Sequence, residues 1–228
     1  EVLNTSSIAG LNKGLYERTG VIYHTKAATW GGVSLAAWMS CRNFDDADTA
    51  YTGKFKFLPG VPVVNLGSAK IQLITGFAPQ LGQSTTTGNI ANTYVDIGSQ
   101  PFVVEGSTLK PNVFLDEIHA SDWITQRTEE AILATFLVND RIEYTDAGLG
   151  ILRAAVAEVM NVARRAGLIA LDRNPTTGEY QPSVVITVPG VFDVPESQRK
   201  ARIAPAIRCQ FRYAGAVHYA VVDYNMTF

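Results

Sequence analysis

Three histidines and two cysteines are the side chains of this sequence best suited to hold a metal ion or a reactive group. The histidines, His24, His119 and His218, stand far apart, and no HxH, HExxH or CxxC spacing joins them to Cys41 or Cys209. We interpret the histidines as ordinary structural residues. Two cysteines are also too few for a disulfide framework, so a reducing compartment is the default.

Two acidic clusters invite a second kind of chemistry. The loop 44–48 carries three aspartates, but it lacks the glycine and the distal glutamate of an EF-hand, and a solvated turn explains it better. Asp116 and Glu117, with Asp122, have the residue types of an acid–base pair, yet closeness in sequence does not fix the distance between carboxylates. No GxSxG, GxxxxGK[ST] or GxGxxG motif is present. The sequence therefore predicts no enzyme, no catalytic residue, no metal ligand and no cofactor.

One stretch near the end of the chain is basic. Between positions 199 and 212 there are five basic residues and no acidic one: Arg199, Lys200, Arg202, Arg208 and Arg212. Such a run is either a solvated face or a surface that docks on an acidic partner. The whole chain has 19 basic against 21 acidic residues, a net charge of −2, so binding to nucleic acid or to an anionic membrane is disfavoured.

The composition is that of a folded protein. Its 228 residues are 46% hydrophobic and 10% aromatic, enough for the core of one large domain or two small ones. No apolar stretch reaches the roughly 18 residues that a membrane span requires. No signal segment opens the chain, which begins with Glu1 rather than Met, and we expect that a segment upstream has been removed.

The expected order of helices and strands indicates a mixed α+β fold. We expect a β-rich first half, followed by two helices packed on a sheet that a C-terminal hairpin closes. A short helix is expected over 33–39, and Ser84–Asn89 is the expected exposed loop. The expected strands are 21–24, 54–58, 71–74, 93–97, 102–104, 113–115, 184–188, 207–213 and 217–224.

The two helices of the second half have clear start and stop signals. Ser121 is expected to cap a helix that ends near Val138, and Thr145 to cap a second one that ends at Gly167. The second helix carries one apolar stripe at spacings of three and four, with two arginines in its last turn. The stripe consists of Leu149, Leu152, Val156, Met160 and Ala163.

Residues 141–148 read Arg-Ile-Glu-Tyr-Thr-Asp-Ala-Gly. Together with several other stretches, they resemble the contractile tail sheath proteins of myovirus-type phages. The helix start of that family is Ile-Pro-Tyr-Thr-Asp-x-Gly, and Glu143 stands where proline is usual. The resemblance covers most of the chain from about Gly14 to Tyr224 and is best from Asn112 onward. The other stretches are 51–61, which contains Leu-Pro-Gly-Val, 112–116 with 122–124, 199–202 and 213–218.

The resemblance implies a structural function and a set of partners. Sheath subunits assemble as six-fold rings stacked around a tail tube, and contraction of the sheath drives the tube through the host envelope. Arms at both chain ends add strands to a sheet of the next subunit, which is β-augmentation. The implied partners are other copies of the chain, the tail tube protein and the baseplate, in a virion tail assembled in the host cytoplasm. Family subunits are larger, so this chain corresponds to their C-terminal part and is expected to be monomeric alone.

The resemblance also divides the chain and names candidate residues. Residues 1–110 correspond to a β-rich outer region and 111–228 to an α+β inner domain with the C-terminal strand. Residues expected to face the tube or a neighbouring subunit are Arg164, Arg165, Arg199, Lys200 and Arg202. Candidates for a strand exchanged between subunits, or for a strand of the chain's own sheet, are Val221, Val222, Tyr224, Met226 and Phe228.

Two other functions stay open at this point. The Ser/Thr-rich loop in the β-rich region 61–118 is also compatible with a baseplate or receptor-binding module of a virion. A hydrolase-like or sugar-modifying enzyme would need polar residues that converge in a cleft, and the missing nucleophile and metal motifs argue against it.

Overall fold

The computed structural model describes residues 6–226, and these form two compact units. The first unit comprises the chain up to Arg42, Tyr51–His119 and the chain from Gly215 onward. The second comprises Asn43–Ala50 and Ala120–Ala214. The sequence placed the boundary after residue 110, whereas the division between the compact units falls after His119. The short segment 43–50 belongs to the second unit, and the C-terminal segment from Gly215 onward belongs to the first unit. The outer and inner roles of the two regions stay predictions.

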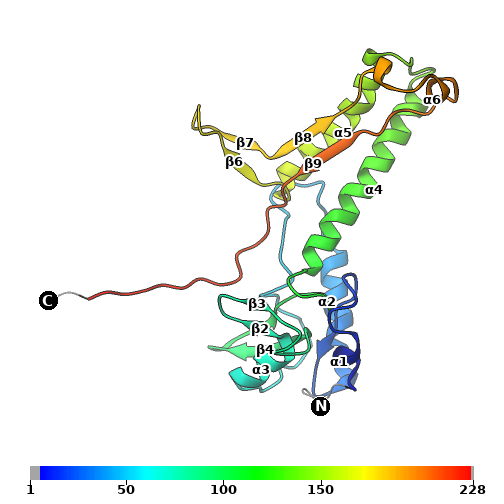
Figure 1. Ribbon diagram of the computed structural model, residues 1–228. Helices are drawn as coiled ribbons and strands as arrows, with labels where there is room; N and C mark the ends of the chain where they lie inside the picture. Colours follow the sequence, from blue (N-terminus) through cyan, green and yellow to red (C-terminus); the bar gives the residue numbers. More distant parts are fainter. Residues whose placement is uncertain (1–5, 227–228) are drawn as a thin grey trace. The chain divides into compact units, whose positions relative to one another are not determined.

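The first unit is built on a three-stranded sheet with short helices (Figure 1). In the sheet, β1 pairs with β4 in parallel and β4 with β5 antiparallel. Its core includes Leu35, Leu58, Val61, Tyr94 and Val103, all of them buried. The elements are α1 Ile8–Asn12, β1 Ile22–Tyr23, η1 Ala27–Thr29, α2 Gly31–Ser40, α3 Ser68–Thr75, β2 Phe77–Ala78, β3 Gly82–Gln83, β4 Asn92–Ile97 and β5 Gln100–Val104.

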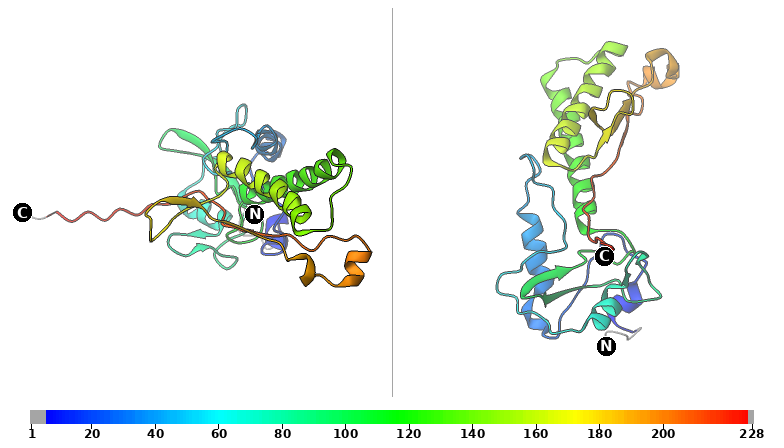
Figure 2. Two further views of the ribbon diagram at one scale, coloured as in Figure 1. Left: turned by 90° about the horizontal axis from the view of Figure 1, so that it is seen from above. Right: turned by 90° about the vertical axis from the view of Figure 1, so that its left-hand side faces the viewer.

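The second unit packs two long helices with a two-stranded sheet, as both views in Figure 2 show. In the sheet, β8 and β9 are antiparallel, and a separate hairpin joins β6 to β7. The division between the units falls inside α4. The elements are α4 Leu115–Val138, α5 Asp146–Ala166, β6 Leu171–Arg173, β7 Tyr180–Pro182, β8 Val184–Thr187, η2 Val191–Asp193, α6 Glu196–Lys200 and β9 Arg208–Phe211.

The helix α5 confirms its predicted limits and its predicted core face. Thr145 is the N-cap, and its side chain accepts a hydrogen bond from the amide of Gly148 at 3.1 Å. Gly167 ends the helix in the left-handed conformation, with φ of +88°. All five residues of the apolar stripe are buried. A Cβ atom at Gly148 would lie 1.9 Å from the carbonyl oxygen of Glu143, so the helix start requires glycine there.

Four of the expected strands were wrong, and the reasons differ. Residues 54–58 form a turn and an irregular segment, with Phe55 in the left-handed region. Residues 71–74 lie in α3, because a short apolar run does not distinguish a strand from a helix. In the expected strand 113–115, Phe114 forms only an isolated bridge to Ser107 before α4 begins at Leu115, seven residues earlier than a cap at Ser121 predicted. The first half is consequently less β-rich than expected.

The fourth error concerns the C-terminal hairpin. The strand β9 pairs with β8, while residues 214–226 contain no strand. The chain's own sheet is therefore not closed by a C-terminal hairpin. The mixed α+β class itself is confirmed. No helix within residues 6–226 is long and apolar enough to cross a membrane.

Candidate functional site

The side chains with possible catalytic chemistry make separate local contacts. Within residues 6–226 no three metal-binding side chains gather. The ring nitrogens of His24 and His119 pair with the Pro62 carbonyl (2.8 Å) and the Tyr51 hydroxyl (2.7 Å), respectively. Asp116 is buried, and its carboxylate accepts a hydrogen bond from the Gly53 amide at 3.2 Å. Asp116 thus has a structural contact in the place where the sequence allowed an acid–base pair.

The five basic candidate residues fall into two groups. Arg164 and Arg165 are exposed in the last turn of α5. The other three lie in or just after α6, which is held near the first turn of α5, because the Tyr144 hydroxyl donates to the Ile203 carbonyl at 2.9 Å. From Tyr144 to Arg164 the chain rises about 30 Å along the helix. The two groups are therefore not one patch on this unit. In the second group, Lys200 is paired with Glu196 at 2.8 Å.

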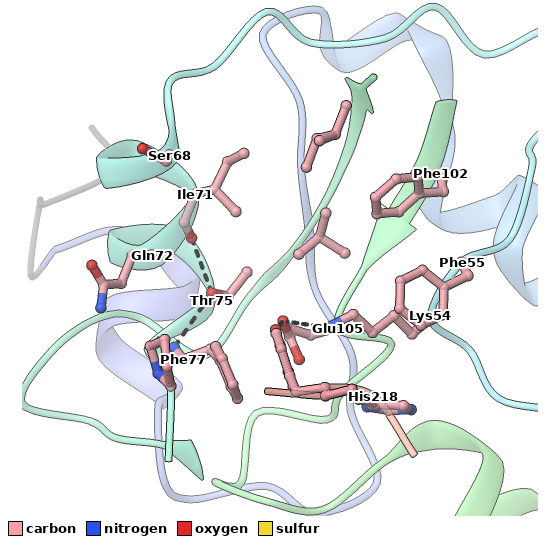
Figure 3. A pocket seen from close by; sticks show the side chains of 15 residues that line it. Lys54, Phe55, Ser68, Ile71, Gln72, Thr75, Phe77, Phe102, Glu105 and His218 are labelled. Carbon is pink, nitrogen blue, oxygen red and sulfur yellow. Dashed lines mark hydrogen bonds and ion pairs between the residues drawn. The ribbon is translucent and has the colours of Figure 1, made fainter. Parts of the chain in front are cut away.

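The C-terminal segment is anchored to the first unit by two consecutive residues, His218 and Tyr219. The His218 imidazole Nε2 is 2.7 Å from the Thr52 hydroxyl, and its ring meets Phe114 edge-on. The Tyr219 ring stacks on Phe77, with 3.7 Å between ring centroids and 6° between planes. The two residues border a cavity of about 500 Å³ with mainly apolar walls (Figure 3).

A buried ion pair lies against the Tyr219 side chain. Lys54 Nζ is 3.0 Å from Glu105 Oε1, and the two side chains are only 4% and 1% exposed. The Tyr219 hydroxyl donates a hydrogen bond to the same carboxylate oxygen, and Lys54 Nζ lies over the Tyr219 ring, 3.6 Å from its centroid. Glu105 Oε2 is buried and has no hydrogen-bond partner within residues 6–226. Contacts with Lys54 and Tyr219 thus offset the free-energy cost of burying the charged Glu105 carboxylate.

Burial controls the ionisation of these groups. It lowers the pKa of the Lys54 ammonium, an effect that the Glu105 carboxylate opposes. Burial, followed by the hydrogen bond to Glu105, raises the pKa of the Tyr219 hydroxyl. Burial also lowers the pKa of His218, and the nearby charge of Lys54 lowers it further. At neutral pH the anchor accordingly holds a protonated phenol and favours a neutral imidazole.

Beyond the anchor the chain is extended and exposed. Residues 220–226 form no helix or strand, and no hydrogen bond joins them to the rest of the described chain. Four of the five strand-exchange candidates fall here, with large exposed fractions: Val221 68%, Val222 65%, Tyr224 93% and Met226 77%. Phe228 lies outside the described residues.

The strand β9 has one edge with no strand partner within residues 6–226. The Arg212 amide donates to the Ser183 carbonyl of the neighbouring chain segment, so antiparallel alternation turns the amides and carbonyls of Cys209 and Phe211 to the open edge. A groove of about 450 Å³ runs along this strand. It is floored by α5 residues such as Leu152 and Met160, and walled by α4 residues and by the Cys209 and Phe211 side chains.

Sequence reasoning missed the anchor and the groove. Lys54 stands in a stretch that alternates like a strand, and nothing near Glu105 or Tyr219 in the sequence indicates that they meet. The partners of the Glu105 carboxylate are 51 and 114 positions away. The exposed apolar residues near the end of the chain are among those that the sequence singled out, and their part in strand exchange stays a prediction.

The comparisons with known proteins agree with the resemblance seen in the sequence. The C-terminal part of this chain is a phage tail sheath domain. Residues 115–226 match the family described as "E217 tail sheath protein gp31-like, C-terminal domain", a match that runs from the start of α4 to the exposed C-terminal segment. No curated protein matches the sequence.

A solved structure shares the fold. It is a chain of the anti-feeding prophage baseplate, determined by cryo-electron microscopy and six-fold symmetrised, with a TM-score of 0.56 and 11% identity. The match covers 89% of this chain and 49% of that one, so this chain spans about half of its length. At this identity the likeness concerns the fold alone. The tail sheath family match over residues 115–226 supports a structural role related to contractile phage tails, with the virion tail as the location.

Proposed function

We propose that the protein is a subunit of a contractile tail sheath that polymerises in stacked six-fold rings around a tail tube. Contraction of this sheath would drive the tube through the host envelope. The observation that carries the proposal is the tail sheath family match over residues 115–226. No metal, cofactor or catalytic residue is part of this function, and assembly takes place in the host cytoplasm.

Subunits are joined in this proposal by β-augmentation. The donor is the segment 220–226, in which Val222, Tyr224 and Met226 alternate with Asp223 and Asn225. Seven extended residues reach about 23 Å. The acceptor is the open edge of β9 in a second copy, where the main-chain groups of Cys209 and Phe211 would receive the added strand. Alternate side chains of that strand would cover the apolar groove beside α4.

The basic residues are the proposed contact with the tube or with a neighbouring subunit. Because the two groups lie about 30 Å apart along α5, each is tested by its own charge reversal. One variant is Arg164→Glu with Arg165→Glu, and the other is Arg199→Glu with Lys200→Glu and Arg202→Glu. We expect at least one to abolish decoration of tubes while the monomer stays folded. Normal sheathed tails from both variants would remove these residues from the proposal.

The direct test is electron microscopy of the protein expressed from its complete gene at high concentration. Hollow, striated tubes or six-fold rings are expected. Discrete globules at every concentration, with and without the tail tube protein, would contradict the sheath proposal. The chain of 228 residues alone is expected to sediment as a monomer, and regular tubes formed by it would show that no further arm is needed.

A baseplate component is the second candidate. The specific observation in its favour is the fold shared with a chain of the anti-feeding prophage baseplate. The two functions differ in stoichiometry, because a sheath subunit repeats along the whole tail whereas a baseplate subunit occurs only at its end. Immunogold labelling of intact particles distinguishes label along the tail from label at its tip.

A further inference from the structure

The C-terminal segment changes character between two neighbouring positions. Up to Tyr219 it is held by ring stacking, a cation–π contact and hydrogen bonds, and from Ala220 it has no hydrogen bond to the described chain. The contacts of Tyr219 come from three separate segments, namely Lys54, Phe77 and Glu105. Such a sharp boundary points to a built attachment point rather than to gradual fraying of a chain end.

The backbone is also constrained at the residues that contact Tyr219. Glu105 has φ of +77°, a left-handed conformation that is strained for a non-glycine residue. The next residue, Gly106, is packed so closely on Gly53 that a Cβ atom there would lie 2.5 Å from the Gly53 carbonyl carbon. This close approach holds Lys54 and Glu105 side by side. The fold therefore tolerates local strain in order to present a buried carboxylate to the Tyr219 hydroxyl.

We infer that Tyr219 is a positioning residue, a latch that fixes the point from which the C-terminal arm leaves its own subunit. With the latch closed, seven residues of the described chain are free, with a reach of about 23 Å. With Tyr219 released and His218 still attached, eight residues are free, with a reach of about 26 Å, and release of His218 as well frees twelve residues from Gly215, with a reach of about 40 Å. The latch thus sets which neighbouring acceptor the arm reaches. The arm's role rests on the proposed sheath function, whereas the latch is a property of the single chain.

Amine footprinting tests whether the latch closes. Lys54 is buried next to the Tyr219 ring, while Lys70 is exposed and serves as the internal standard. In Tyr219→Ala, acylation of Lys54 relative to Lys70 is expected to rise at least ten-fold. The matched control is Tyr224→Ala, the same change in the exposed part of the segment, and it is expected to leave the ratio unchanged. Tyr219→Phe keeps the ring and loses only the hydroxyl, so its ratio is expected to lie between the two.

Distance measurements test whether the latch positions the arm. Spin labels on the natural Cys41, which is exposed in the first unit, and on Val222→Cys report the position of the arm, with Cys209→Ser removing the second thiol. The distance distribution is expected to be narrower with Tyr219 than with Tyr219→Ala. Equal widths, or Lys54 that reacts equally in both proteins, would overturn the inference. Both experiments use the single chain, so a failure of sheath assembly in microscopy would leave their outcome intact.

Discussion

Two of the sheets in the described chain, β1-β4-β5 and β8-β9, have outer edges of opposite kinds. In the first unit the outer edge of β5 is closed, because Pro101 has no amide to donate and the main chain of Val103 is bonded to Phe55 and Lys56 at 3.0 Å. In the second unit the outer edge of β9 is open above an apolar groove. A blocked β5 edge beside an open β9 edge directs strand addition toward β9 rather than β5, and such a preference favours ordered polymerisation.

The largest expected effect on stability comes from the buried ion pair between Lys54 and Glu105, on which the closed edge of β5 depends. Glu105→Ala leaves Lys54 buried without its partner, and we expect a loss of about 3–5 kcal/mol in the free energy of unfolding of the first unit. Urea denaturation monitored by tryptophan fluorescence measures this change. The control is Glu17→Ala, which removes the exposed ion pair between Lys110 and Glu17 in the same unit and is expected to change stability very little. Equal effects of the two variants would show that the buried pair does not hold the edge closed.

The close approach of two main-chain segments at the same edge gives the next largest effect. Gly106→Ala would place a Cβ atom 2.5 Å from the Gly53 carbonyl carbon, so the backbone must move. Gly98 has nearly the same φ, +65° against +67°, but no atom within 4 Å of the added Cβ. We expect Gly98→Ala to lower the free energy of unfolding by the conformational cost alone, about 1–2 kcal/mol, with a matching fall in the melting temperature. Gly106→Ala is expected to lower the melting temperature clearly more. Similar melting temperatures of the two variants would show that the Gly53–Gly106 contact adapts without cost.

The open edge of β9 can be closed by one substitution. Cys209→Pro removes an amide that points away from β8, so the monomer should stay folded while subunit assembly is weakened at least about ten-fold, or about 1.4 kcal/mol. Gln210→Pro removes an amide that points toward β8, and it is expected to destabilise the second unit itself. Circular dichroism of the 228-residue chain measures folding, and light scattering of the protein expressed from its complete gene measures assembly. Undiminished assembly of Cys209→Pro would exclude this edge as the acceptor.

The contrast between the edges also explains what could be predicted from the sequence. The helix α5 was predictable to the residue, because its cap, its apolar stripe and its terminal glycine all lie within one continuous stretch. The closed edge was not, because Lys54 is buried only through Glu105, 51 positions away, and Phe55 is exposed as a consequence of its left-handed backbone. An alternating pattern alone therefore indicated a strand in which the apolar residues would have been buried.

The smallest effect concerns the pH dependence of the anchor beside the closed edge. His218 faces Lys54, Glu105 and Asp116, and burial is the main cause of its lowered pKa. When the segment is released, its pKa returns toward the ordinary 6.5, so the released form binds more protons. Attachment is therefore fully stabilised above pH 6.5 and weakens as the pH falls from there through the lower pKa of the attached form.

Nuclear magnetic resonance of the segment 215–226 measures this weakening. Between pH 7.5 and 5 we expect the attached-to-released ratio to fall, because the released form binds more protons. His218→Gln, whose side chain does not titrate, should keep the ratio constant over the same range. A pH response of equal size in His218→Gln would assign it to another group of the anchor.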